Sequence, residues 1–198
     1  MKHRFQCLCG KVAGEVDEPR RAMRAVCYCR DCQAYAHLLK RPERVLDALG
    51  GTDIVATHAR YVRFTRGLDS LACLSLSPKG LLRWYARCCN TPIANTPRAW
   101  KLPYIGFVHT CLRQPDPFER DFPKVQMRIN TGSAHGTPPK DNSPLGYARF
   151  MAMVMRLGAS RLAGGAKVHP FFGAQGSPVV PIQLADRAAV DAARHAAA

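Results

Sequence analysis

Seven of the nine cysteines in this chain of 198 residues fall into three closely spaced groups, Cys7-Leu8-Cys9, Cys27-Tyr28-Cys29-Arg30-Asp31-Cys32 and Cys88-Cys89. A C-x-C step on an extended strand places both sulfurs on one face, because side chains alternate along a strand. A C-x-x-C step needs a turn, which brings two sulfurs round one ion. Zinc prefers such soft ligands and usually takes four of them. The spacing therefore predicts thiolate zinc binding, whereas the isolated Cys73 and Cys111 are expected to be buried core residues.

The sequence contains no signal for membrane insertion or secretion. It has no run of about 18 apolar residues, and the segment from Met1 to Cys7 lacks the apolar core of a secretory signal. We therefore expect a cytoplasmic protein with no membrane partner. In a reducing cytosol, clustered cysteines act as metal ligands or reactive thiols more often than they form disulfides. The odd number of cysteines agrees with that interpretation.

The chain is strongly basic, with 29 Lys and Arg against 14 Asp and Glu and a formal net charge of +15. One interpretation is an arginine-rich surface without a specific role, and the other is an anionic partner such as nucleic acid or an acidic small molecule. The basic residues are spread along the chain, and several thiolates around one Zn²⁺ would reduce the net charge. Nucleic acid is therefore a possible partner but not the favoured one, and the pattern carries no signal for an oligomeric state.

The first half of the chain predicts a mainly β fold built from short antiparallel strands. Alternating apolar residues and turn signals recur about every 8–12 residues, with strands expected at 53–57, 61–65, 71–76 and 81–85. Beyond residue 100 the composition changes. Gly, Ser, Pro and Asn dominate 131–144, which predicts a loop, and apolar residues at helical spacing predict a helix over about 146–163. We expect a β domain over 1–112 and an extension over 113–198 that packs on or covers it.

The order of the cysteine motifs resembles that of the glutathione-dependent formaldehyde-activating enzyme family, which also includes centromere protein V. The matching segments are Cys7-Leu8-Cys9-Gly10, then Cys27 to Cys32, then Trp84 to Pro92, which ends in Cys-x-Thr-Pro. The resemblance covers roughly residues 3–112. It implies a tent-like zinc-binding β domain, and this chain would be a divergent member with a C-terminal extension containing at least one helix.

The resemblance also implies two zinc sites, one structural and one catalytic. Carried over by position, Cys7, Cys9 and Cys89 belong to the structural site. Cys27, Cys29 and Cys32 belong to the catalytic site, which keeps a fourth position for water or substrate.

The chain departs from the family pattern at the third cysteine group. Ala86 stands where the family has a cysteine, and Asn90 stands where it has a glycine. Cys88 is one candidate for the missing thiolate, and its use requires a kink or bulge because neighbouring residues on a strand point opposite ways. Otherwise another residue such as a histidine fills the position, or this zinc is absent. We therefore expect one or two zinc ions per chain.

The implied activity is that of a carbon–sulfur lyase-like enzyme acting on a glutathione or other small-thiol adduct of an aldehyde such as formaldehyde. Arg30 lies inside the second cysteine group and is the nearest candidate to bind an anionic thiol substrate, although an exposed arginine with no such role is the favoured interpretation. The alternative is a non-catalytic, zinc-stabilised binding module whose basic surface binds nucleic acid or a protein partner. A third hypothesis is a sensor that loses its metal on oxidation.

Overall fold

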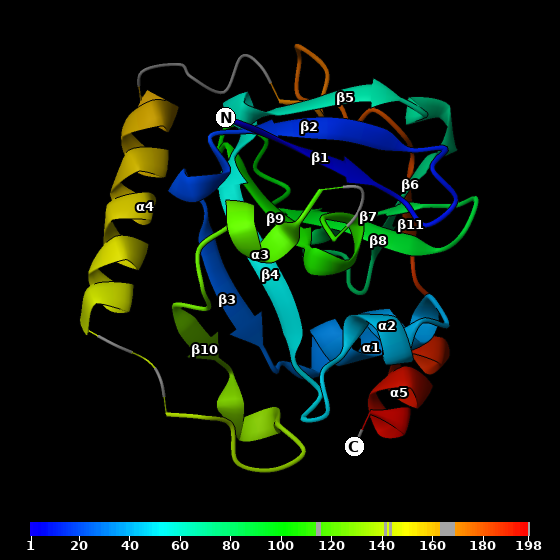
Figure 1. Ribbon diagram of the computed structural model, residues 1–198. Helices are drawn as coiled ribbons and strands as arrows, with labels where there is room; N and C mark the ends of the chain where they lie inside the picture. The colour runs from blue at the N-terminus through cyan, green and yellow to red at the C-terminus, as the bar shows by residue number, and fades with distance from the viewer. Residues whose placement is uncertain (114–115, 141, 143, 163–168, 198) are drawn as a thin grey trace.

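The computed structural model describes residues 1–113, 116–140, 142, 144–162 and 169–197, and two β-sheets form its centre (Figure 1). The smaller sheet has the order β1-β2-β5, formed by β1 (Lys2–Gln6), β2 (Ala13–Asp17) and β5 (Val62–Arg66). The larger sheet has eight strands in the order β10-β3-β4-β9-β8-β7-β6-β11. Its strands are β3 (Met23–Cys27), β4 (Thr52–His58), β6 (Leu71–Ser75), β7 (Leu82–Ala86), β8 (Thr91–Thr96), β9 (Tyr104–Val108), β10 (Met127–Ile129) and β11 (Ile182–Leu184).

Most neighbouring strands are antiparallel, and the two exceptions come from beyond residue 112. Strand β10 pairs in parallel with β3 at one edge of the larger sheet, and β11 pairs in parallel with β6 at the other edge. The prediction of a mainly β protein is confirmed. The later part of the chain thus supplies both edge strands of the sheet that the earlier part forms.

The main core lies between one face of the larger sheet and the smaller sheet. On β7, Leu82, Trp84 and Ala86 alternate into this core and are fully or almost fully buried. Phe5 from the smaller sheet packs on Phe107 of β9, with ring centroids 5.0 Å apart. Because side chains alternate along a strand, the intervening residues of each strand face the opposite side of the larger sheet.

Helices α1 (Arg30–Leu38), α2 (Pro42–Val45), α4 (Pro144–Leu162) and α5 (Arg187–Ala196) lie on that opposite side or at its edges. The short helix α3 (Phe118–Asp121) instead places Phe118 in the main core. Figure 1 shows α1, α2 and α5 together at one end of the larger sheet and α4 along its side. Helix α4 is the helix expected over about 146–163, of which residue 163 lies outside the described residues. The expected loop over 131–144 contains a single 3-10 turn at Thr131–Ser133 in its described part.

Helix α5 is held against α1 by an apolar cluster that includes Tyr35, Leu39 and Val190. Helix α4 is attached through fewer groups, among them a 2.8 Å hydrogen bond between His58 Nε2 and Ser160 Oγ. None of the described helices combines the length and the hydrophobicity needed to cross a bilayer.

A buried arginine joins β3, β4 and α3. The Arg24 guanidinium lies 2.7 Å from the carboxylates of both Asp53 and Glu119, and it stacks on the Phe118 ring at 4.4 Å. Arg24 is almost completely buried, whereas Glu119 is exposed. Paired charges tolerate such burial, but a single charge left behind does not.

We therefore expect Arg24→Met to lower the free energy of unfolding by about 3–5 kcal/mol, because it leaves the Asp53 carboxylate without a partner. The measurement is urea denaturation followed by circular dichroism. The matched control is Arg63→Met, which removes an exposed ion pair with Glu15 and should cost about 1 kcal/mol or less. Equal losses in the two variants would contradict this account.

Candidate metal centres

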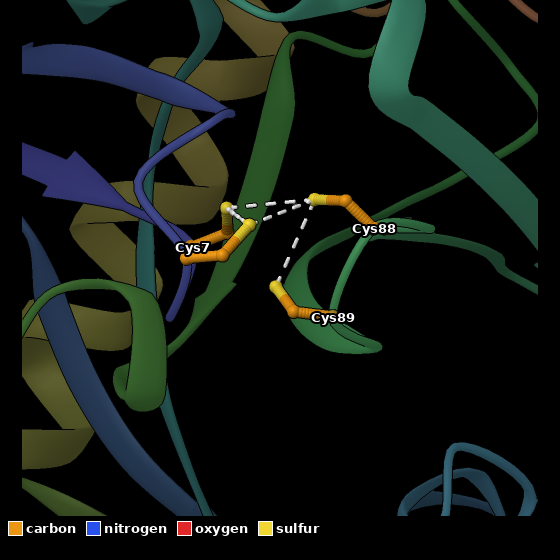
Figure 2. A group of neighbouring side chains, drawn as sticks. Cys7, Cys88 and Cys89 are labelled. Atoms are coloured by element: carbon orange, nitrogen blue, oxygen red, sulfur yellow. Dashed lines mark hydrogen bonds between the residues drawn. The ribbon is translucent and has the colours of Figure 1, made fainter.

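The turn of the β1–β2 hairpin and the turn after β7 bring four cysteines together (Figure 2). The Sγ atom of Cys88 lies 3.2 Å from that of Cys9, 3.9 Å from that of Cys7 and 3.8 Å from that of Cys89. A tetrahedral zinc with sulfurs at about 2.3 Å has S···S edges of about 3.8 Å. A disulfide needs sulfurs about 2.05 Å apart, and all four cysteines are free. The spacing fits a four-thiolate metal site.

Cys88 is the residue that completes this group, and turn geometry explains how. Strand β7 ends at Ala86, and the next residues form a turn in which Asn90 has a φ of 53°. Cys88 and Cys89 are therefore not adjacent on a strand, and both sulfurs can face the β1–β2 hairpin. Ala86 is buried in the core between the sheets and takes no part.

Amide and hydroxyl groups surround these four sulfurs. The backbone N–H of Val12 donates to Cys7 Sγ at 3.3 Å, and Thr91 Oγ1 lies 3.0 Å from Cys89 Sγ. The backbone N–H of Lys11, followed by the Cys88 thiol, lowers the pKa of Cys9 to about 6. Donors of this kind favour the thiolate over the thiol, and the thiolate is the form that binds a metal.

The second group forms where β3 runs into α1. Cys27 is the last residue of β3, Cys29 caps the N-terminus of α1, and Cys32 lies in its first turn. Their three Sγ atoms all lie within 4.8 Å of one another. Cys27 and Cys32 are buried, and Cys29 is partly exposed. The strand end and the helix start are both local structures, which is why this spacing brings the sulfurs together.

The second group gathers negative charge in a buried place. Hydrogen bonds from the Cys29 and Cys32 thiols lower the pKa of Cys27, and Asn130 Nδ2 also donates to its sulfur at 3.4 Å. The hydrogen bond to Cys27 raises the pKa of Cys32, and burial raises it further. Hydrogen bonds between these sulfurs thus favour one thiolate, at Cys27, and a bound cation would favour the thiolate form of the other two. The group fits a metal ion with three protein ligands and one open position.

A cavity of about 510 Å³ adjoins this group. Alternate residues of neighbouring strands form its floor, on the sheet face opposite the main core. A cross-strand row runs over this face through Ala56, Gly106, Asn95 and Arg83. A Cβ atom on Gly106 would lie 2.6 Å from the Tyr104 hydroxyl, so the glycine leaves room for that phenol. The apolar walls include Met23, Ile54, Leu76, Leu81, Phe150 and Met153.

Of the two residues between Cys29 and Cys32, the structure places Asp31 at the cavity and Arg30 outside it. Arg30 is exposed at the start of α1 and is not among the described residues that line the cavity. Asp31 lines it, with its carboxylate held 2.7 Å from Arg194 of α5. The arginine in the cavity is Arg83, whose Nη1 lies 3.9 Å from Cys32 Sγ. Sequence reasoning missed Arg83, although a single charged residue inside the apolar segment 81–85 was a usable signal.

The two isolated cysteines, Cys73 and Cys111, are fully buried in the main core and belong to neither group, as expected. Burial raises the pKa of Cys73 to about 12. It behaves as a small apolar side chain.

No curated protein matches this chain. A solved structure of a Rhodobacter sphaeroides protein aligns with a TM-score of 0.43 and 20% sequence identity, covering 64% of this chain and 99% of that one. A family described only as a family of unknown function, DUF6151, matches residues 3–183, which include both cysteine groups and the first two residues of β11. The chain belongs to this family.

Proposed function

We propose that the protein binds two zinc ions and is a carbon–sulfur lyase-like enzyme acting on a small-thiol adduct of an aldehyde. The four-cysteine group would hold a structural zinc, because four thiolates leave no ligand position open. The three-cysteine group would hold a catalytic zinc with one open position. The observation that carries the proposal is the cavity of about 510 Å³ directly beside the three-cysteine group, since a purely structural site needs no such space.

The reaction breaks the carbon–sulfur bond of a thiohemiacetal and releases an aldehyde and a thiol. The hydroxyl of the adduct loses its proton as its oxygen becomes the aldehyde carbonyl, and the sulfur leaves with the bonding electrons. Zinc, when bound, would stabilise the leaving sulfur as a thiolate. No oxidant or reductant is needed, and the reverse step is the addition of thiol to aldehyde.

Two cavity residues have suitable chemistry for the oxygen of the adduct. Burial raises the pKa of Tyr104 to about 12, with smaller electrostatic contributions from the nearby Cys32 and Cys27 sulfurs. Tyr104 therefore stays protonated at neutral pH and can donate a hydrogen bond to the aldehyde oxygen. Asp31 is the only carboxylate among the described residues that line the cavity, and we assign it as the acceptor of the hydroxyl proton.

Elemental analysis of reduced, freshly purified protein should find two zinc ions per chain. Cys29→Ala should retain one zinc and the fold, because the three-cysteine group is local. Cys9→Ala should also lose one zinc but unfold more easily, since structural zinc contributes about 10–16 kcal/mol. The control is Cys73→Ala, which should keep both ions. Zinc contents that are near zero, or that neither ligand variant changes, would refute the two-site assignment.

Exchange between ¹³C-formaldehyde, a small thiol and their adduct can be followed by NMR exchange spectroscopy. We expect the zinc-loaded protein to accelerate exchange and Cys29→Ala to return it to the uncatalysed rate. Tyr104→Phe should lower the acceleration about 10²-fold, the effect of losing one donor to a developing oxyanion. Tyr147→Phe, on the exposed side of α4, is the control. A protein with both zinc ions but no acceleration would contradict the lyase proposal.

One surface feature favours the alternative of a binding module for a polyanion. A groove of about 400 Å³ beside α3 and α4 is lined by five arginines, Arg20, Arg21, Arg120, Arg149 and Arg156. Asp121 is the only carboxylate among its described lining residues, and Arg120 pairs with it at 2.7 Å. Such a groove matches the charge of a phosphate backbone.

If the groove binds nucleic acid, replacing Arg20, Arg149 and Arg156 by Gln should weaken binding to a fluorescent single-stranded oligonucleotide. The slope of log affinity against log salt should fall by about 0.7 for each lost phosphate contact. Replacing Arg44, Arg60 and Arg63 changes the net charge equally and serves as the control. Equal effects of the two triple variants would show that only net charge matters, and would exclude the groove as a binding site.

A further inference from the structure

Arg83 is buried in the floor of the cavity without a carboxylate partner. The solvent-exposed fraction of Arg83 is 4%, close to the 6% of the buried Arg24. Arg24 has two carboxylates, Asp53 and Glu119. Among the described residues, Arg83 donates only to Asn95 Oδ1 at 3.4 Å and Cys32 Sγ at 3.9 Å, and its guanidinium lies 5.2 Å from the centre of the Tyr35 ring.

The hydrogen-bonding capacity of Arg83 is only partly used. A guanidinium carries five N–H donors in a planar fork that matches a carboxylate. Both hydrogen bonds that the Arg83 side chain makes to described residues come from Nη1, whereas its Nε and Nη2 donate to no described residue. Because a buried charge is costly unless it is paired and hydrogen-bonded, these donors are suited to an anionic group that enters the cavity.

The remainder of the cavity is suited to an apolar ligand. Ile54, Leu76, Phe150 and Met153 form much of its wall, and Asp31 is the only carboxylate in its described lining. Glutathione has two carboxylates, an ammonium group and two peptide bonds. Most of those groups would lose their hydration here without finding a partner, which costs free energy for each of them.

We propose that the substrate of this site is the aldehyde adduct of a small thiol that carries one carboxylate and a short apolar body. The carboxylate pairs with Arg83, the sulfur lies at the Cys27–Cys29–Cys32 group, and the apolar body contacts Phe150 and Met153. This inference rests on the proposed function and makes Arg83 the residue that determines specificity for the thiol.

The test uses the full-length protein with Co²⁺ in place of Zn²⁺, because thiol binding at the open position changes the visible absorption of cobalt. The probes are 3-mercaptopropionate and its uncharged amide, which have almost the same shape, with glutathione as a third ligand. We expect the acid to bind about 10-fold or more tightly than the amide, the size of one charged hydrogen-bonded contact. Glutathione should bind more weakly than the acid.

Arg83→Gln should abolish the preference for the acid and leave the affinity for the amide unchanged. The control is Arg30→Gln, which should keep the preference. If Arg83→Gln does not fold by circular dichroism, Arg83→Lys takes its place and should retain a reduced preference.

Three results would overturn the inference. They are equal binding of acid and amide by the native protein, a preference that survives Arg83→Gln, and a loss of cobalt with equal weakening of both thiols. The last result would mean that Arg83 only balances the charge of the metal site. A cobalt spectrum that no thiol changes would instead refute the proposed function.

Discussion

The alternation of side chains across the eight-stranded sheet is the constraint on which the rest of the structure depends. One face must be apolar, because Leu82, Trp84 and Phe107 pack there against the smaller sheet. Every residue between them is then directed to the other face, whatever its chemistry. This is how Arg83 comes to share a surface with Cys27 at the end of β3. A one-residue slip of β7 would send the arginine into the core and empty the cavity floor.

Closely spaced sulfurs make both cysteine groups able to hold a metal ion, and their surroundings explain why the two groups differ. The four-cysteine group lies between the β1–β2 hairpin and the turn after β7, so its side chains connect the smaller sheet to the larger one. The three-cysteine group lies within one strand end and one helix turn and adjoins a cavity. A metal ion in the four-cysteine group would hold separate segments together. A metal ion in the three-cysteine group would have room for a further ligand.

The part of the chain beyond residue 112 completes the cavity. Ile129 and Asn130 at the end of β10 line it, and Phe150 and Met153 of α4 form a wall. Arg194 of α5 holds Asp31 beside it. The extension therefore contributes to the geometry of the candidate site, and a shorter chain with the same cysteine groups would have a more open metal site with fewer apolar contacts.

The sequence by itself determined that Cys7 lies near Cys9 and that Cys27, Cys29 and Cys32 lie together, because a C-x-C hairpin turn and a C-x-x-C helix start are set by neighbouring residues. It also predicted the mainly β fold and the helix α4, whose periodicities are local. Only the tertiary structure decided that Cys88 completes the four-cysteine group, that Arg83 rather than Arg30 lies in the cavity, and that β10 and β11 form the edges of the sheet. These features depend on strand register and on pairing between distant segments. Strands as short as three residues carry too little pattern to reveal such pairing in the sequence.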